Sequence, residues 1–196
     1  KGFGRSIEEL FTGMLNRDYF PVQLEDMQAN MIFHSISDFK PQKIGDVTLS
    51  YTYTNHPGVT YCFKIEKNGR TVGYATDNEF LMGHHGSPLD VEESDPIMEP
   101  FTHTVDFFKG CDVLIHEAQY MPDEYKSKVG WGHSSILTAT ALIKMADIKD
   151  WVVTHHDPSH TDKFLREKLS YQKEILKDCK ISCQLEFAYD GMRIYL

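Results

Sequence analysis

Two features of the sequence predict an α/β fold with parallel strands: a region of alternating strands and helices, and a β-hairpin that precedes it. The alternating region reads as strand, helix, strand, helix, strand over residues 111–115, 134–146, 151–154, 161–177 and 182–187. Strands joined in this way lie parallel and connect through right-handed crossovers. The last helix is expected to bury one apolar face, formed by Phe164, Leu165, Leu169, Tyr171, Ile175 and Leu176.

The predicted hairpin is centred on Asn68-Gly69, a pair that favours a two-residue turn because both positions need positive φ. This turn sets Ile65 opposite Val72, so that apolar side chains face each other across the pair. The two strands cover residues 59–66 and 70–76, and alternating residues 46–53 predict a further half-buried strand.

The remaining segments give weaker signals. Ser6-Ile7-Glu8-Glu9 has the spacing of a capping box and predicts a helix over residues 6–15. Residues 30–36 predict a strand. Residues 80–100 form an acidic stretch that contains Gly83-His84-His85-Gly86, and we expect it to be an exposed loop.

Length, charge and cysteine content limit the classes of function. The 196 residues suit one domain, and 41% are hydrophobic. A net charge of -9 disfavours nucleic acid or an anionic membrane as the general partner, and no apolar run is long enough to span a bilayer. The four scattered cysteines, Cys62, Cys111, Cys179 and Cys183, predict reduced thiols in a cytoplasmic protein.

Histidines and carboxylates gather at one predicted edge of the sheet. Asp77, Glu117 and His155 each follow a strand, while His56 precedes the hairpin at its open end and His133 begins a crossover helix. Ligands of α/β sheets bind at this edge. Imidazole and carboxylate groups are the ligands that zinc and similar ions prefer, and a carboxylate can bridge two ions. The sequence therefore predicts a metal site that contains His56, Asp77 and His155.

Five segments occur in a characteristic order: Asn55-His56-Pro57-Gly58, Tyr74-Ala75-Thr76-Asp77-Asn78-Glu79, Leu114-Ile115-His116-Glu117-Ala118, Gly132-His133-Ser134-Ser135 and Val153-Thr154-His155-His156-Asp157-Pro158. From about residue 46 onward this series resembles the metallo-β-lactamase superfamily, and it is similar to the phosphodiesterase branch that includes ribonuclease Z. The resemblance implies that the chain is the C-terminal part of an αββα sandwich.

The same resemblance implies roles for individual residues. His56, Asp77 and His155 correspond to the third, fourth and fifth metal-binding motifs, with Asp77 bridging two divalent ions. Zinc is the expected metal, and manganese and iron also suit these ligands. Glu117 corresponds to the glutamate that orients a catalytic histidine, which is His133 here.

The chain departs from the family in one large respect, because no H-x-H-x-D-H motif precedes His56. We therefore expect residues 1–196 to be a single, incomplete domain whose N-terminal half has been removed or lies in another chain. Residues 1–45 are then a connecting segment from that half. We expect these 196 residues alone to bind little metal and to be inactive.

The leading functional hypothesis is a metal-dependent phosphodiesterase in which a metal-bound hydroxide attacks a small phosphodiester or a nucleotide-like substrate. His133, held by Glu117, would stabilise the phosphate or protonate the leaving oxygen. Two alternatives stay open: a metal-dependent hydrolase of lactones, thioesters or amides, and a metal-free binding or regulatory module. The acidic charge disfavours a role in tRNA processing, and a homodimer is compatible with the sequence.

Overall fold

The computed structural model describes residues 4–34 and 39–196, and the chain divides into a first unit ending at Phe39 and a second unit from Lys40 to Leu196. The first unit contains α1 (Ile7–Met14) and a short 3₁₀ turn at Leu24–Asp26. Ser6 and Glu9 cap α1 reciprocally, which confirms the predicted helix. The strand predicted over residues 30–36 is wrong for residues 30–34, which are irregular, and residues 35 and 36 lie outside the described ranges.

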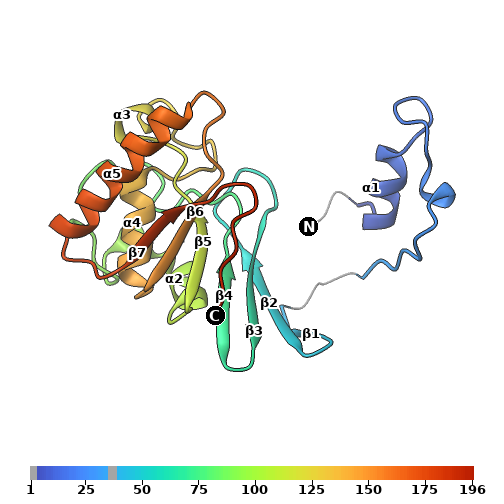
Figure 1. The fold of residues 1–196 in the computed structure, drawn as a ribbon, viewed down its shortest axis with the longest axis horizontal. Coiled ribbons are helices and arrows are strands. Elements are labelled where there is room, and N and C mark those ends of the chain that lie inside the picture. Colours follow the sequence, from blue (N-terminus) through green and yellow to red (C-terminus); the bar gives the residue numbers. More distant parts are fainter. Residues whose placement is uncertain (1–3, 35–38) are drawn as a thin grey trace. The chain divides into compact units, whose positions relative to one another are not determined.

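Seven strands in the described part of the second unit form one mixed sheet in chain order (Figure 1). The first four pair antiparallel and the last four pair parallel, so β4 belongs to both patterns. The strands are β1 (Gln42–Ile44), β2 (Val47–Tyr53), β3 (Tyr61–Lys67), β4 (Arg70–Tyr74), β5 (Val113–Glu117), β6 (Asp150–Thr154) and β7 (Gln184–Phe187). The predicted βαβαβ order is confirmed, whereas β1 was not expected from the sequence.

The hairpin of β3 and β4 has the predicted register. Ile65 pairs with Val72, and Lys67 pairs with Arg70 around the turn at Asn68 and Gly69, both of which have positive φ. Because the turn residues adopt the conformation that the Asn-Gly pair favours, the turn fixes which side chains share a face of the sheet.

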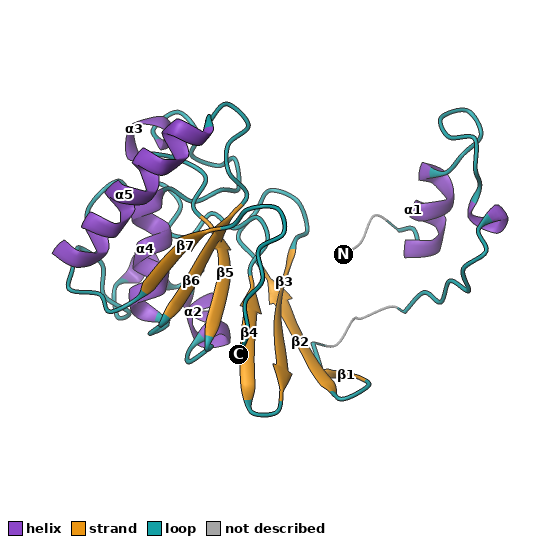
Figure 2. Cartoon of the chain, viewed as in Figure 1, coloured by secondary structure: helices purple, strands orange, loops and turns teal. Residues whose placement is uncertain are grey.

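Helices cover the face of the sheet that carries Leu114 and Trp151, both buried (Figure 2). These helices are α2 (Thr102–Phe108), α4 (Ile136–Met145) and α5 (Asp162–Asp178), and a single turn, α3 (Pro122–Tyr125), precedes α4. Neither α2 nor α3 was predicted. Of the helices in the described ranges, none combines the length and apolar character needed to cross a bilayer.

The buried face of α5 differs from the expected one. Ile175 and Leu176 are buried as predicted, but Tyr171 is exposed and the prediction for it is wrong. Lys168 is buried instead, because its ammonium group donates to the backbone oxygen of Gln119 at 2.8 Å while its alkyl chain lies in the core.

Residues 80–100 are not an exposed loop, so that prediction is wrong in part. Phe80 and Leu81 are fully buried. Met98 belongs to a 3₁₀ turn, and its side chain is part of the core. Acidic residues such as Glu92 and Glu93 remain exposed. Apolar side chains at each end of the acidic stretch therefore hold it against the hydrophobic core of the second unit.

His116 on β5 is buried between two polar partners. Its Nδ1–H donates to the backbone oxygen of Glu117, and its Nε2 accepts from the side-chain amide of Asn78 at 2.9 Å. This arrangement requires the neutral ring. Burial lowers the pKa of His116 to about 4.

Acidification should destabilise the fold through His116. Between its folded pKa of about 4 and an ordinary value near 6.5, the unfolded chain binds a proton that the folded chain does not. The free energy of unfolding should therefore fall as the pH decreases through this range, by up to about 1.4 kcal/mol per pH unit for this group. Chemical denaturation at several pH values should show a steeper decline for the wild type than for His116→Gln, and equal slopes would contradict the assignment.

Candidate metal and catalytic site

The predicted site residues meet at the carboxyl-terminal edge of the parallel strands. Asp77 follows β4, Glu117 ends β5 and His155 follows β6, as the strand order requires. His56 lies in the segment between β2 and β3, and His133 lies just before α4. All five residues are within the described ranges, and the contacts below connect them.

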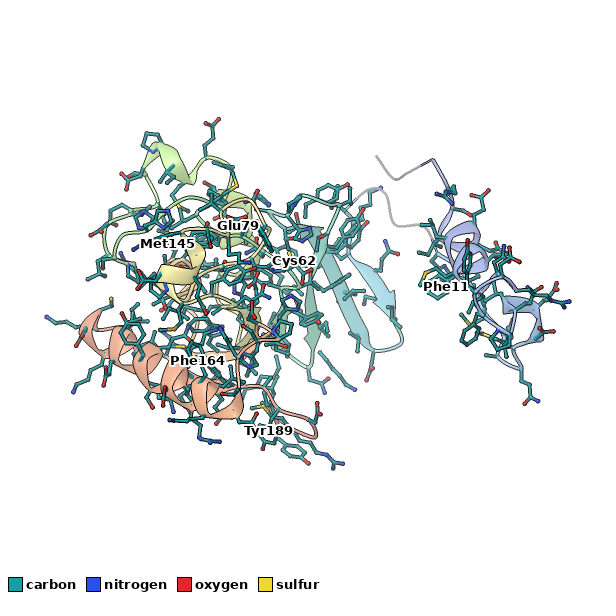
Figure 3. All side chains as sticks on the ribbon, turned by 90° about the horizontal axis from the view of Figure 1, so that it is seen from above. Phe11, Cys62, Glu79, Met145, Phe164 and Tyr189 are labelled. Carbon is teal, nitrogen blue, oxygen red and sulfur yellow. The ribbon has the colours of Figure 1, made fainter. Side chains whose placement is uncertain are left out.

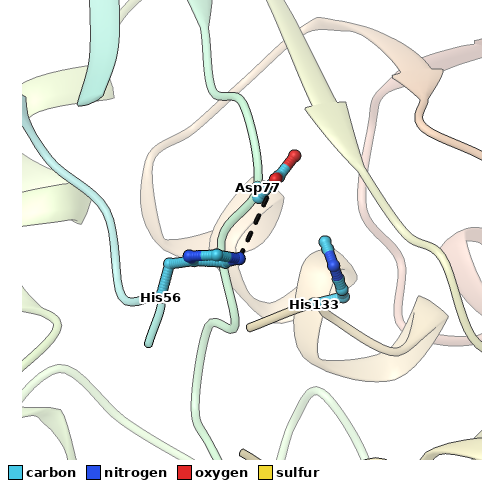
Figure 4. A group of neighbouring side chains, drawn as sticks. All are labelled: His56, Asp77 and His133. Atoms are coloured by element: carbon cyan, nitrogen blue, oxygen red, sulfur yellow. Dashed lines mark ion pairs between the residues drawn. The ribbon is translucent and has the colours of Figure 1, made fainter. Parts of the chain in front are cut away.

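Asp77 lies between two histidines. The Nε2 atom of His56 is 3.8 Å from Oδ2 of Asp77 (Figure 4). The Nε2 atom of His155 is 3.7 Å from Oδ1 of the same carboxylate. Each histidine thus faces a different oxygen of one carboxylate. His155 has a φ of 54°, a left-handed conformation that is unfavourable for a residue with a side chain.

His133 lies close to both of the other imidazoles. Its ring centroid is 4.8 Å from that of His155, in a stacked arrangement with an interplanar angle of 27°, and 5.7 Å from that of His56. Among the described residues, a group that could share one cation is formed by His56, Asp77 and His133, whose ligand atoms lie within 4.8 Å of one another. The sequence predicts His155 as the third ligand and His133 as a catalytic residue, whereas this group contains His133 and not His155.

The Glu117 carboxylate is fully buried and accepts four hydrogen bonds. Its Oε1 accepts from Nδ1 of His133 at 3.1 Å and from the backbone N–H groups of Asn78 and Ser134 at 3.0 and 3.1 Å. Its Oε2 accepts from the N–H of Gln119 at 3.1 Å. Because Nδ1 of His133 donates to this carboxylate, Nε2 is the ring atom left to face the site.

The pair of Glu117 and His133 has altered proton affinities. Burial raises the pKa of Glu117, although the hydrogen bonds it accepts favour its ionised form. Partial burial of His133 disfavours its charged form, but the hydrogen bond to Glu117 and the charges of Glu117, Asp77 and Glu79 outweigh it, so the pKa of His133 is raised. Because its pKa is raised, a larger fraction of His133 carries a second ring proton near neutral pH than an ordinary histidine would.

A second buried carboxylate, Glu79, holds the loop that precedes His133. Its Oε1 accepts from the Tyr125 hydroxyl at 2.7 Å and from the N–H of Gly130 at 2.8 Å, and its Oε2 accepts from the N–H of Gly132 at 2.8 Å. Glu79 lies among densely packed side chains and is 1% exposed (Figure 3). In the sequence Glu79 belongs to the same segment as Asp77, but nothing there indicates these partners, which are about 50 residues away.

Gly132 allows the His133 loop to lie directly against His56. A Cβ atom at Gly132 would be 2.1 Å from Cδ2 of His56 and 2.7 Å from Cδ of Pro57. Gly132 also has a φ of 92°, which favours glycine. The absence of a side chain is therefore a requirement for the observed position of the His56 ring.

Other histidines of the second unit and Asp157 have structural contacts. His116 is part of the core, and the carboxylate of Asp157 accepts from the N–H and hydroxyl of Ser159 in a turn. The Nε2–H of His160 donates to the carboxylate of Glu124 at 2.9 Å, and His103 donates to the backbone oxygen of Tyr53. These contacts explain the positions of these residues without a ligand.

Comparisons with known proteins indicate the fold. No protein family model matches the chain. Ribonuclease Z of Brevibacillus brevis is 32% identical over 65 residues, or 33% of this chain, and ribonuclease BN of Proteus mirabilis is 25% identical over 128 residues, or 63% of this chain. The metallo-β-lactamase fold protein YhfI from Bacillus subtilis superposes with a TM-score of 0.58 and 21% identity over 80% of this chain.

The matches cover only part of each relative. The chain spans 20% and 42% of the two curated ribonucleases and 53% of YhfI. The structural similarity confirms the predicted α/β class and the metallo-β-lactamase fold. At this level of identity it shows the fold alone, so activity must be argued from the side chains.

Replacing Gly132 with alanine should weaken metal binding more than the same change at Gly130. Both glycines have positive φ and donate to Glu79, so the backbone strain is similar. A Cβ at Gly130 meets no atom within 4 Å, whereas one at Gly132 displaces His56. Because these 196 residues alone are expected to bind little metal, the comparison is between variants: in zinc titration the affinity of Gly132→Ala should be about tenfold or more below that of Gly130→Ala. Matching affinities would show that His56 does not need this close approach.

Glu79→Gln should destabilise the protein by about 1–3 kcal/mol, because a single amide oxygen cannot replace both carboxylate oxygens as acceptors for three buried donors. Tyr125→Phe removes one of these donors and also the hydroxyl that accepts from the N–H of Gly83, and it is the variant for comparison. Urea denaturation should rank Glu79→Gln below Tyr125→Phe in stability. If the two variants were equally stable, the loop contacts at Gly130 and Gly132 would contribute no more than the Gly83 contact does.

Proposed function

We propose that this chain carries the catalytic edge of a metal-dependent phosphodiesterase. The observation that carries the proposal is the Glu117–His133 pair beside Asp77 and His56. A buried carboxylate that orients an imidazole toward a cluster of metal-type ligands is suited to proton transfer near a bound cation. The metallo-β-lactamase fold and the resemblance to ribonucleases support a hydrolase.

The donor set fits a divalent metal ion. His56, Asp77 and His155 supply two imidazoles and a carboxylate, all partly accessible, and the two imidazoles approach different oxygens of Asp77. Zinc, manganese and iron accept such ligands. When bound there, a divalent ion would lower the pKa of a coordinated water and so provide a nucleophile near neutral pH.

His133 would act as the proton donor. Glu117 fixes Nδ1 of its ring, so Nε2–H of the protonated imidazole can donate to a phosphate oxygen or to the leaving oxygen. The raised pKa of His133 increases the fraction that carries this proton near neutral pH. Glu79 contributes to this role indirectly, because its carboxylate accepts from Gly132 and so fixes the loop that carries His133.

The proposed substrate is a small phosphodiester or nucleotide-like molecule. A cationic imidazole favours an anionic group at the site, whereas the net charge of -9 disfavours a long polyanion. Cleavage of RNA is the second candidate, because the curated relatives are named ribonuclease Z and ribonuclease BN. Comparing the rates at which the protein hydrolyses a bis-aryl phosphate and a tRNA precursor separates the two candidate functions.

His133→Ala should lower kcat toward a bis-aryl phosphate by at least about 100-fold, because general acid catalysis typically contributes this much. Metal content, measured by elemental analysis of the protein that carries this chain, should not change if His133 is a proton donor. Glu117→Gln, which keeps an acceptor but removes the charge, should lower kcat less. Unchanged turnover in His133→Ala would end the assignment, and loss of metal would make His133 a ligand, as its distance from His56 and Asp77 allows.

A further inference from the structure

Trp131 is an exposed aromatic residue in the loop that leads to His133. It is 57% exposed, whereas the other tryptophan of the chain, Trp151, is 1% exposed. The ammonium group of Lys128 lies 3.7 Å from the centre of the Trp131 ring system, a close cation–π contact. Such exposure of a large aromatic side chain leaves ring surface available to a ligand.

The loop holds Trp131 firmly. The N–H of Trp131 donates to the backbone oxygen of Lys128 at 3.0 Å, and the glycines on both sides of Trp131 donate to the buried carboxylate of Glu79. The indole is therefore presented on an anchored turn. Anchoring before binding reduces the ordering cost of a ligand contact.

Trp131 is also close to the candidate site. It directly precedes Gly132, whose backbone lies against the ring of His56. It is two residues from His133, so their Cα atoms are at most about 7.6 Å apart. A substrate with its reacting phosphate at His133 would therefore have its remaining part within reach of the indole.

Lys128 places positive charge beside Trp131, in the loop that leads to His133. The Lys128 ammonium lies 3.7 Å from the centre of the Trp131 ring system, so its charge is next to the exposed indole. The site itself contains the carboxylates of Asp77 and Glu117. A cation beside them favours an anionic ligand.

We infer that Trp131 and Lys128 form a binding platform for the substrate: a planar aromatic ring of the substrate stacks on the indole, and an oxygen of its phosphate contacts the Lys128 ammonium. This inference rests on the proposed phosphodiesterase function and specifies its substrate class as nucleotides and related aryl phosphates. Base-to-aromatic stacking is a strong and sequence-tolerant contact.

Binding of adenosine monophosphate to the 196-residue chain tests the platform without turnover. Selectively excited tryptophan emission should be quenched to saturation, because Trp131 is exposed and Trp151 is buried. Ribose 5-phosphate, which lacks the ring, should not quench. Adenosine, which lacks the phosphate, should bind at least about fivefold more weakly.

Variants assign the signal to the two residues. Trp131→Ala should abolish the quenching, and calorimetry should show that it lowers the affinity for adenosine monophosphate about tenfold. Lys128→Gln should make the nucleotide and the nucleoside bind alike. Lys126→Gln, which changes an exposed lysine of the same loop paired with Asp123, is the control and should bind as the wild type does.

Failure of this inference and failure of the proposed function give different results. Absence of saturable nucleotide binding, or binding that Trp131→Ala and Lys128→Gln leave unchanged, would overturn the platform even if bis-aryl phosphates are hydrolysed. Binding that depends on both residues supports the platform, even if phosphodiesters are not hydrolysed and the proposed function therefore fails.

Discussion

The burial of the Glu117 carboxylate is the constraint on which the rest of the site depends. A charged group without water must be surrounded by donors, since an unpaired buried charge costs several kcal/mol. The donors come from three segments: the loop after β4, the segment that follows β5 and the loop before α4. Packing these segments around Glu117 also places His133 against it. The same contacts therefore stabilise the fold and orient the imidazole.

A continuous set of contacts links the loop after β4 to the loop before α4. The hydroxyl of Ser134 donates to the backbone oxygen of Asn78 and accepts from the N–H of Phe80, and Glu79 accepts from Gly130 and Gly132. Hydrogen bonds between side chains and the backbone thus connect these two loops, in place of the backbone hydrogen bonds that join paired strands. Site residues supported in this way are held in place before a ligand arrives.

The sequence predicts the parts of the fold that repeat locally. The hairpin register follows from Asn68-Gly69, and the strand order places Asp77, Glu117 and His155 on one edge. The support by Glu79 could not be predicted, because its partners are about 50 residues away and leave no periodic pattern. Apolar periodicity also misplaced Tyr171, since a buried lysine with a hydrogen-bonded ammonium group resembles a surface residue in sequence.

The shared position of β4 has a consequence for distant substitutions. One edge of β4 pairs with the hairpin strand and the other with β5, and Asp77 lies just beyond its carboxyl end. Side chains alternate between the two faces of a strand, so shifting β4 by one residue would exchange the faces of all its side chains. Inserting a residue between Asn68 and Gly69 is therefore expected to displace Asp77 from its two imidazoles, although the insertion lies at the opposite end of the strand.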